Sequence, residues 1–79
     1  MIIQWGRVNA ERNTVYHNFS ISFTSAETWI GAAQNAQNMS ASAGAKIFRG
    51  TSGVNFIPVA VNSNGEKYTD LIDWIAIGY

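Results

Sequence analysis

Hydrophobic and polar residues alternate along much of this chain, which is the pattern of a β-strand that buries one face. The clearest alternation runs from residue 14 to residue 23, where every second side chain is apolar or aromatic: Val15, His17, Phe19, Ile21 and Phe23. We predict a half-buried strand over this stretch. Other apolar runs predict further strands at residues 1–8, 45–49, 54–61 and 71–77.

Turn signals separate these predicted strands. Asn64-Gly65 is the strongest short turn signal in the chain. The sequence Gly-Thr-Ser-Gly at 50–53 predicts a second turn, between two strands. Pro58 has no N–H to donate to a sheet ladder, so we expect it at a sheet edge or at a bulge.

A middle segment carries conflicting signals. Thr24 and Glu27 have the spacing of a helix capping box, and apolar residues follow at helical intervals, so a helix at 25–39 is one interpretation. A glycine, several Asn residues and the predicted strands on both sides favour a short strand at 27–33 instead. Under this second interpretation Gln34 to Gly44 forms a long loop, and loops of that length are uncommon in small domains unless they have a function.

The stretch DLIDWIAIGY predicts a strand that is apolar on both faces. One face carries Leu71, Asp73, Ile75, Ile77 and Tyr79, and the other carries Ile72, Trp74, Ala76 and Gly78. An antiparallel strand with one buried face alternates more cleanly than this. We therefore expect the strand to be covered twice, by the protein core and by a neighbouring subunit.

The composition narrows the possible functions. Seventy-nine residues make one domain, 1–79, with a thin core, and such domains usually gain stability from disulfides, metals or self-association. The chain has no cysteine and one histidine, so we expect self-association, and we predict no metal and no other cofactor. Charged residues make up only 13% of the chain, and the five basic residues form no run. We therefore expect no nucleic-acid partner and no membrane insertion.

Candidate catalytic groups are sparse. Asp70 and Asp73 are the only close pair of acids, and a spacing of three places their side chains on opposite faces of a strand. We interpret them as solvated or ion-paired surface acids. His17 has no acid or nucleophile at a fixed spacing, so we expect it in or beside the core or a subunit interface. The sequence therefore predicts no enzyme activity.

Three motifs carry a resemblance to a known family. IIQWG near the start, FSISF in the middle and WIAIGY at the end resemble the gp53-like C-terminal domain of phage and prophage tail fibres. The resemblance implies an all-β fold, a small antiparallel β-sandwich of about six strands similar to the H-type lectin domain. It also implies a homotrimer at the tail fibre tip of a virion, made in the host cytoplasm, with a role in recognising the host. Ser20 stands where the family often has Pro, and the loop at 34–44 matches no family motif.

The loops and the resemblance together indicate which residues we expect to bind a receptor and which we expect to form the trimer interface. Loop amides and aromatic rings suit a bacterial surface polysaccharide or an outer-membrane protein. The expected ligand-binding residues are Asn35, Asn38, Asn62, Asn64, Tyr68 and Trp29. The expected trimer-interface residues are Trp74, Ile75, Ile77 and Tyr79. We interpret Trp5 and Trp74 as core residues, and core packing is also an open alternative for Trp29.

Two functions stay open at this point. The favoured one is a tail-fibre tip domain that assembles as a trimer and binds a receptor, a glycan above all, on the host cell. The alternative is a purely structural module that trimerises or caps the fibre while another part binds the host. A depolymerase is disfavoured because no pair of acids is suitably placed.

Overall fold

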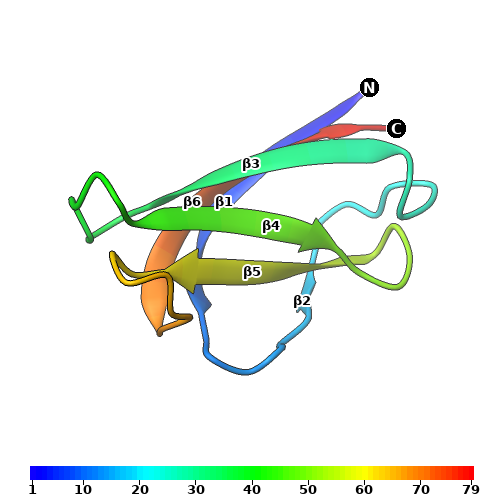
Figure 1. Cartoon of the computed structure of the whole chain (residues 1–79). Helices are drawn as coiled ribbons and strands as arrows, with labels where there is room; N and C mark the ends of the chain where they lie inside the picture. The colour runs from blue at the N-terminus through cyan, green and yellow to red at the C-terminus, as the bar shows by residue number, and fades with distance from the viewer.

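The computed structural model describes residues 1–79 and contains six β-strands and no helix. The strands are β1 (Ile2–Ala10), β2 (His17–Asn18), β3 (Trp29–Asn35), β4 (Gly44–Arg49), β5 (Asn55–Val61) and β6 (Asp70–Gly78). They form two antiparallel sheets, which we call sheet A (β1-β6-β3) and sheet B (β2-β5-β4) (Figure 1). The expected all-β fold is confirmed. A helix at 25–39 is excluded, because β3 lies within that stretch.

The C-terminal strand β6 lies in the centre of sheet A. β1 pairs with one of its edges and β3 pairs with the other. Even-numbered positions from Asp70 to Gly78 face the core and odd-numbered positions face outward, so the predicted division into two faces is confirmed. Beyond the strand, Tyr79 donates its backbone N–H to Thr28, and its carbonyl oxygen accepts from the Thr24 N–H and the Thr28 hydroxyl. The end of the described chain is therefore held rather than frayed.

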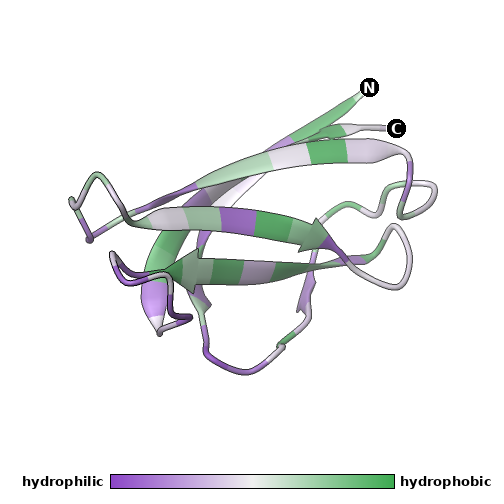
Figure 2. Cartoon of the chain, in the orientation of Figure 1, coloured by the Kyte–Doolittle hydropathy of each residue, from purple (hydrophilic) through white to green (hydrophobic).

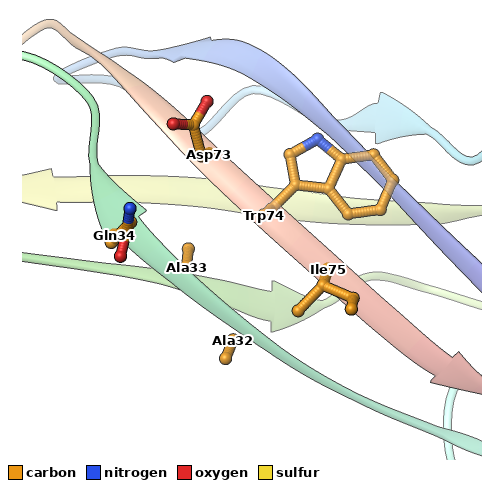
Figure 3. A pocket seen from close by; sticks show the side chains of 6 residues that line it. All are labelled: Ala32, Ala33, Gln34, Asp73, Trp74 and Ile75. Atoms are coloured by element: carbon orange, nitrogen blue, oxygen red, sulfur yellow. The ribbon is translucent and has the colours of Figure 1, made fainter.

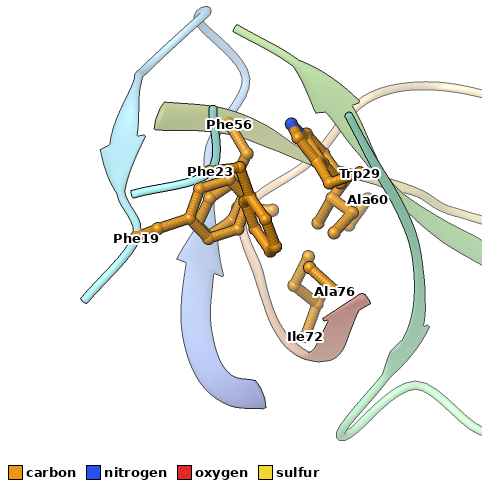
Figure 4. Packing of buried hydrophobic residues seen from close by; sticks show 9 residues of the cluster. Phe19, Phe23, Trp29, Phe56, Ala60, Ile72 and Ala76 are labelled. Atoms are coloured by element: carbon orange, nitrogen blue, oxygen red, sulfur yellow. The ribbon is translucent and has the colours of Figure 1, made fainter. Parts of the chain in front are cut away.

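The core lies between the two sheets and is rich in aromatic rings (Figure 4). One cluster contains the nine buried apolar residues: Ala10, Phe19, Phe23, Trp29, Ile47, Phe56, Ala60, Ile72 and Ala76. The Phe19 ring meets the rings of Phe23 and Trp29 edge-on, with centroids 4.9 and 5.0 Å apart. Phe56 packs 4.8 Å from both Phe19 and Trp74. Because both sheets contribute to this cluster, its burial holds them together.

The alternating stretch at 14–23 does not form the long strand that its pattern predicts. Only β2 pairs with β5, and beyond it Phe19 and Phe23 turn into the core while Ile21 stays exposed. The buried amide of Gln4 accounts for the difference. Its Nε2 donates to the Ile21 carbonyl oxygen over 2.7 Å, and its Oε1 accepts from the Ile21 N–H over 3.2 Å. A side chain thus satisfies the backbone groups that a neighbouring strand would have paired.

The predictions for turns and for the proline are confirmed. Gly65 has a φ of +80° in the connection between β5 and β6, a conformation that favours glycine. Residues 50–53 lie in the short connection between β4 and β5. β2 pairs with only the first two residues of β5, so Pro58 lies where β5 has no strand on its β2 side.

Two tryptophans differ from their expected positions. The sequence interpretation places Trp5 in the core, but its side chain is 74% exposed on the outer face of sheet A, because its neighbour Gln4 takes the inward position. Trp29 is only 3% exposed and lies in the core, with its indole Nε1 unpaired. Its assignment as a ligand-binding residue is therefore wrong, and its alternative as a core residue is confirmed. Trp74 is half-buried against the core, as expected.

Candidate functional site

Both chain termini lie at one end of the sandwich (Figure 1). The outer face of sheet A is exposed and largely apolar at this end. Two rows of side chains cross its three strands there: Ile3, Ile77 and Ile30 in one row, and Trp5, Ile75 and Ala32 in the next. We call these six side chains face A. Ile30 is 68% exposed and is thus nearly as accessible as Trp5. The following row is polar and borders face A with Arg7, Asp73 and Gln34.

A shallow hollow follows the seam between β3 and β6 at this border (Figure 3). Its volume is about 290 Å³, and it is lined by Ala32, Ala33, Gln34, Asp73, Trp74 and Ile75. A second hollow of about 150 Å³ adjoins it on face A, beside Ile30 and Ile77. The short side chain of Ala32 leaves this space next to the larger side chain of Ile75. The surface is therefore uneven enough to receive side chains from another molecule.

Arg7 and Asp73 form the one salt bridge of the chain. Nε and Nη2 of Arg7 donate to the two carboxylate oxygens of Asp73 over 2.7 and 3.1 Å, so the pair is bidentate. The hydrogen bond from Arg7 lowers the pKa of Asp73 below its usual range, and the same contact raises the pKa of Arg7. The interpretation as a solvated or ion-paired surface acid is confirmed for Asp73 and wrong for Asp70, which is 7% exposed and makes no salt bridge. Both side chains are accessible to water, so the pair adds orientation more than stability.

At the other end of β3, three polar side chains surround the Tyr68 hydroxyl, and we call these four residues the hydroxyl cluster. This hydroxyl donates to Asp70 Oδ2 over 2.8 Å and accepts from Nδ2 of Asn38 and of Asn35 over 3.0 and 3.2 Å. Asn35 Nδ2 also donates to Asp70 Oδ2 over 3.0 Å. A hydroxyl has one proton and two lone pairs, so that of Tyr68 is fully used. Burial, followed by the bond to Asp70, raises the pKa of the Tyr68 phenol.

The turn at 62–66 lies beside this cluster, two residues before Tyr68. Asn62 Oδ1 accepts the backbone N–H groups of Asn64 and Glu66 over 2.9 and 3.0 Å, which stabilises the turn. Asn64 stays exposed. Figure 2 shows hydrophilic residues gathered in this connection, whereas the strands carry bands of hydrophobic residues.

No group of three or more His, Cys, Asp or Glu residues is placed to hold a metal ion. Asp70 faces inward and Asp73 faces outward on β6, as the spacing predicts, so they do not act on one substrate atom. His17 is half-buried, with its ring 6.0 Å from that of Phe56. No helix of this fold has the length and the apolar character needed to cross a membrane.

The comparison with protein families decides the identity. A family model described as "Putative tail fiber protein gp53-like, C-terminal" matches residues 1–79, the whole chain. The chain belongs to this gp53-like family. No curated protein and no solved structure shows a significant match to it. The resemblance carried by IIQWG, FSISF and WIAIGY is therefore confirmed, and the family implies a component of a phage virion.

The gp53-like domain brings five of the six expected ligand-binding residues to one end. Asn35, Asn38 and Tyr68 meet in the hydroxyl cluster, and Asn62 and Asn64 lie in the adjacent turn. Trp29 lies at the opposite end of β3, about 20 Å away by strand geometry. Asn64 alone among the five makes no side-chain hydrogen bond within the chain. We call the connections at 36–43 and 62–66 the loop end.

The residues expected at a subunit interface divide between two sides of the gp53-like domain. Ile75 and Ile77 belong to face A, and Tyr79 is exposed next to it. Trp74 lies on the inner side and packs against the core. Sequence reasoning missed four members of face A: Ile3, Trp5, Ile30 and Ala32. One signal could have found the first two, because IIQWG has large apolar residues on both faces, as the C-terminal strand does.

Proposed function

We propose that this gp53-like domain assembles as a homotrimer through face A and presents its loop end to a receptor on the host cell surface. The observation that carries the proposal is the exposure of face A. Its six side chains expose on the order of 500 Å² of apolar surface, which is near the upper end for the largest patch on a monomer. In a domain of 79 residues, such a patch favours burial against further copies.

A threefold arrangement suits a single apolar patch on each copy. When three copies turn the same face toward one axis, each copy contacts both neighbours, and the ring closes. The polar row with Arg7 and Asp73 then lies at the rim of the contact, where charged groups keep access to water. The resemblance to trimeric tail-fibre domains favours this symmetry over a twofold pair.

The two ends of the sandwich differ in a way that supports a position at the fibre tip. Both termini lie at one end, and the loop end lies at the other (Figure 1). A fibre shaft that joins on the N-terminal side of the domain therefore leaves the loop end pointing away from the shaft. In this orientation the loops are the first part of the domain to meet the host.

The loop end suits recognition of a surface glycan by hydrogen bonds. Exposed neutral side chains gather there, namely Asn64, Ser63, Gln37, Ser40 and Ser42. Amides and hydroxyls can both donate and accept, as a polysaccharide requires. Each site alone binds weakly, and three copies in one trimer raise the overall affinity without any new contact.

Binding of the labelled full chain to a panel of bacterial cells tests this function. Light scattering should show a trimer, and Asn64→Ala should weaken cell binding without changing the mass, because the Asn64 side chain makes no internal hydrogen bond. Asn13→Ala, at another exposed asparagine in the β1–β2 loop, is the matched control. A monomeric parent chain contradicts the assembly. Equal cell binding by the two variants contradicts the assignment of the loop end.

A purely structural trimerisation or capping module is the second candidate. This candidate is favoured because all hydrogen-bonding positions of the Tyr68 hydroxyl are occupied within the chain. The hydroxyl cluster then stabilises the 36–43 loop instead of binding a ligand. A stable trimer that binds no cell in the panel would select this function.

A further inference from the structure

The outer face of sheet B carries a second apolar surface with a larger hollow. Its volume is about 350 Å³, and the residues that matter in its lining are Gly44, Lys46, Phe48, Val59, Val61 and Lys67. We call it the sheet B hollow. The Phe48 ring is 47% exposed and offers a flat apolar surface beside the two valines. Gly44 and Lys46 come from β4, next to the 36–43 loop, and Lys67 follows the 62–66 turn.

Backbone pairing sets the positions of the two lysines on opposite flanks of β5. Lys46 lies opposite Val59 in the β4–β5 ladder. On the other flank, Lys67 forms an isolated bridge with Val61. Across two strand spacings and two residues along β5, their Cα atoms are about 12 Å apart. Gly44 lies opposite Val61 and has no side chain, which leaves the hollow open at this point.

The charge of the hollow is positive and uncompensated within the chain. The one salt bridge of the chain joins Arg7 to Asp73, so neither Lys46 nor Lys67 is paired with an acid. Glu66, the sequence neighbour of Lys67, makes no salt bridge with either lysine. The ammonium group of Lys46 lies 5.8 Å from the centre of the Phe48 ring, which holds it at the edge of the apolar surface.

The sheet B hollow stays accessible when face A forms the threefold contact. Sheets A and B cover opposite sides of the core, so their outer faces point away from each other. If copies joined face A to the outer face of sheet B, the contact would be head-to-tail between opposite sides, which propagates an open array instead of closing a ring. A closed trimer therefore presents three sheet B hollows to the solvent.

We propose that the sheet B hollow binds a carboxylate-bearing polysaccharide. The apolar surface of Phe48 and the valines fits the C–H faces of sugar rings, and the two ammonium groups fit carboxylates on successive parts of the chain. The hollow adjoins the loop end, so one glycan chain can contact both. This inference rests on the proposed receptor function and specifies its ligand as an acidic glycan.

Titration with oligogalacturonate, a chain of uronic acid units, tests the inference directly. Amide resonances of Lys46, Phe48 and Lys67 should shift on binding, and dextran, a neutral chain, should leave them unchanged. Lys46→Glu and Lys67→Glu should each weaken binding about tenfold, because each replaces an attraction by a repulsion. Arg12→Glu makes the same charge change in the β1–β2 loop and should leave binding unaltered. Raising the salt concentration should also weaken binding several-fold.

A second variant, Gly44→Val, fills the sheet B hollow and leaves both lysines in place. Gly44 has no positive φ, and a Cβ built on it lies 3.5 Å from Val61 Cγ2, which is an ordinary contact. Gly44→Val therefore fits a strand position while filling the hollow, and it should abolish binding with no loss of fold.

Several results would overturn the inference. These are the absence of shifts at the three residues, equal shifts with dextran, and unchanged binding by the lysine variants. Equal binding of polyglutamate would assign the hollow to an acidic protein segment instead. A change of mass in Gly44→Val would mean that this face is a subunit contact. Cell binding that persists while oligogalacturonate fails leaves the receptor function standing, whereas oligogalacturonate binding without cell binding rejects that function alone.

Discussion

Replacement of Trp5 by threonine tests whether face A is the contact between subunits. Trp5 lies at the end of a row on face A, and its ring makes no aromatic contact within the chain and is not part of the core cluster. Threonine favours strand structure, so β1 should be kept. The substitution therefore removes apolar area from the proposed interface while leaving the subunit folded.

The size of the effect follows from the exposure of the ring. A tryptophan that is 74% exposed leaves about 180 Å² available for burial, worth about 4 kcal/mol per copy at ~25 cal/mol per Å². Incomplete burial reduces this to about 2–4 kcal/mol. Even the lower value, lost in each of the three copies, raises the concentration needed for assembly more than about 100-fold.

Light scattering over a range of concentrations measures this shift. The parent chain should have the mass of a trimer, and its melting temperature should rise with concentration. Trp5→Thr should have the mass of a monomer at the same concentrations, with unchanged far-UV circular dichroism. Tyr16→Thr is the control, because Tyr16 is also an exposed aromatic residue but lies outside face A. A trimer of undiminished stability in Trp5→Thr, or an equal loss in Tyr16→Thr, would refute the reasoning.

Three further predictions concern the tail, the core and the hydroxyl cluster. Deleting residues 77–79 removes the centre of one row of face A and the three backbone hydrogen bonds of Tyr79, so the product should be monomeric or insoluble; unchanged mass and melting would mean that the tail is not structural. Phe56→Ala removes a ring that is 1% exposed and should cost about 3–5 kcal/mol, enough to unfold much of the protein by near-UV circular dichroism. The raised pKa of Tyr68 means that its contribution to stability is complete below about pH 10 and is lost as the pH rises through the higher pKa of the folded state. Tyr68→Phe should therefore flatten the fall of the melting temperature above pH 10, and an identical alkaline profile would contradict this.

Local sequence patterns were sufficient to predict those structural features that depend only on neighbouring residues in the chain. The strand at the C-terminus has the two predicted faces, one with Ile72 and the other with Ile77, because the pleat of a strand assigns successive side chains to opposite faces. Asn64-Gly65 formed the predicted turn for a similar reason, since φ at Gly65 is a local property. The family motifs were also readable from the chain alone.

Contacts between distant segments decided the rest. The alternation places Trp5 and Gln4 on opposite faces of β1, but it does not predict which of these faces lies against sheet B. Packing in the folded protein places Gln4 on the inner face. The same amide then bonded to Ile21, 17 residues away, and ended the strand that the alternation of 14–23 predicts. The Tyr68 hydroxyl, which looked free for a sugar, is saturated by Asn35 and Asn38 from 33 and 30 residues away and by Asp70. The sequence by itself thus determined most of the strands, the turns and the family, because these depend on local geometry and on motifs. Only the tertiary structure decided which apolar face stays exposed and which polar groups stay free, because both depend on what the rest of the chain covers.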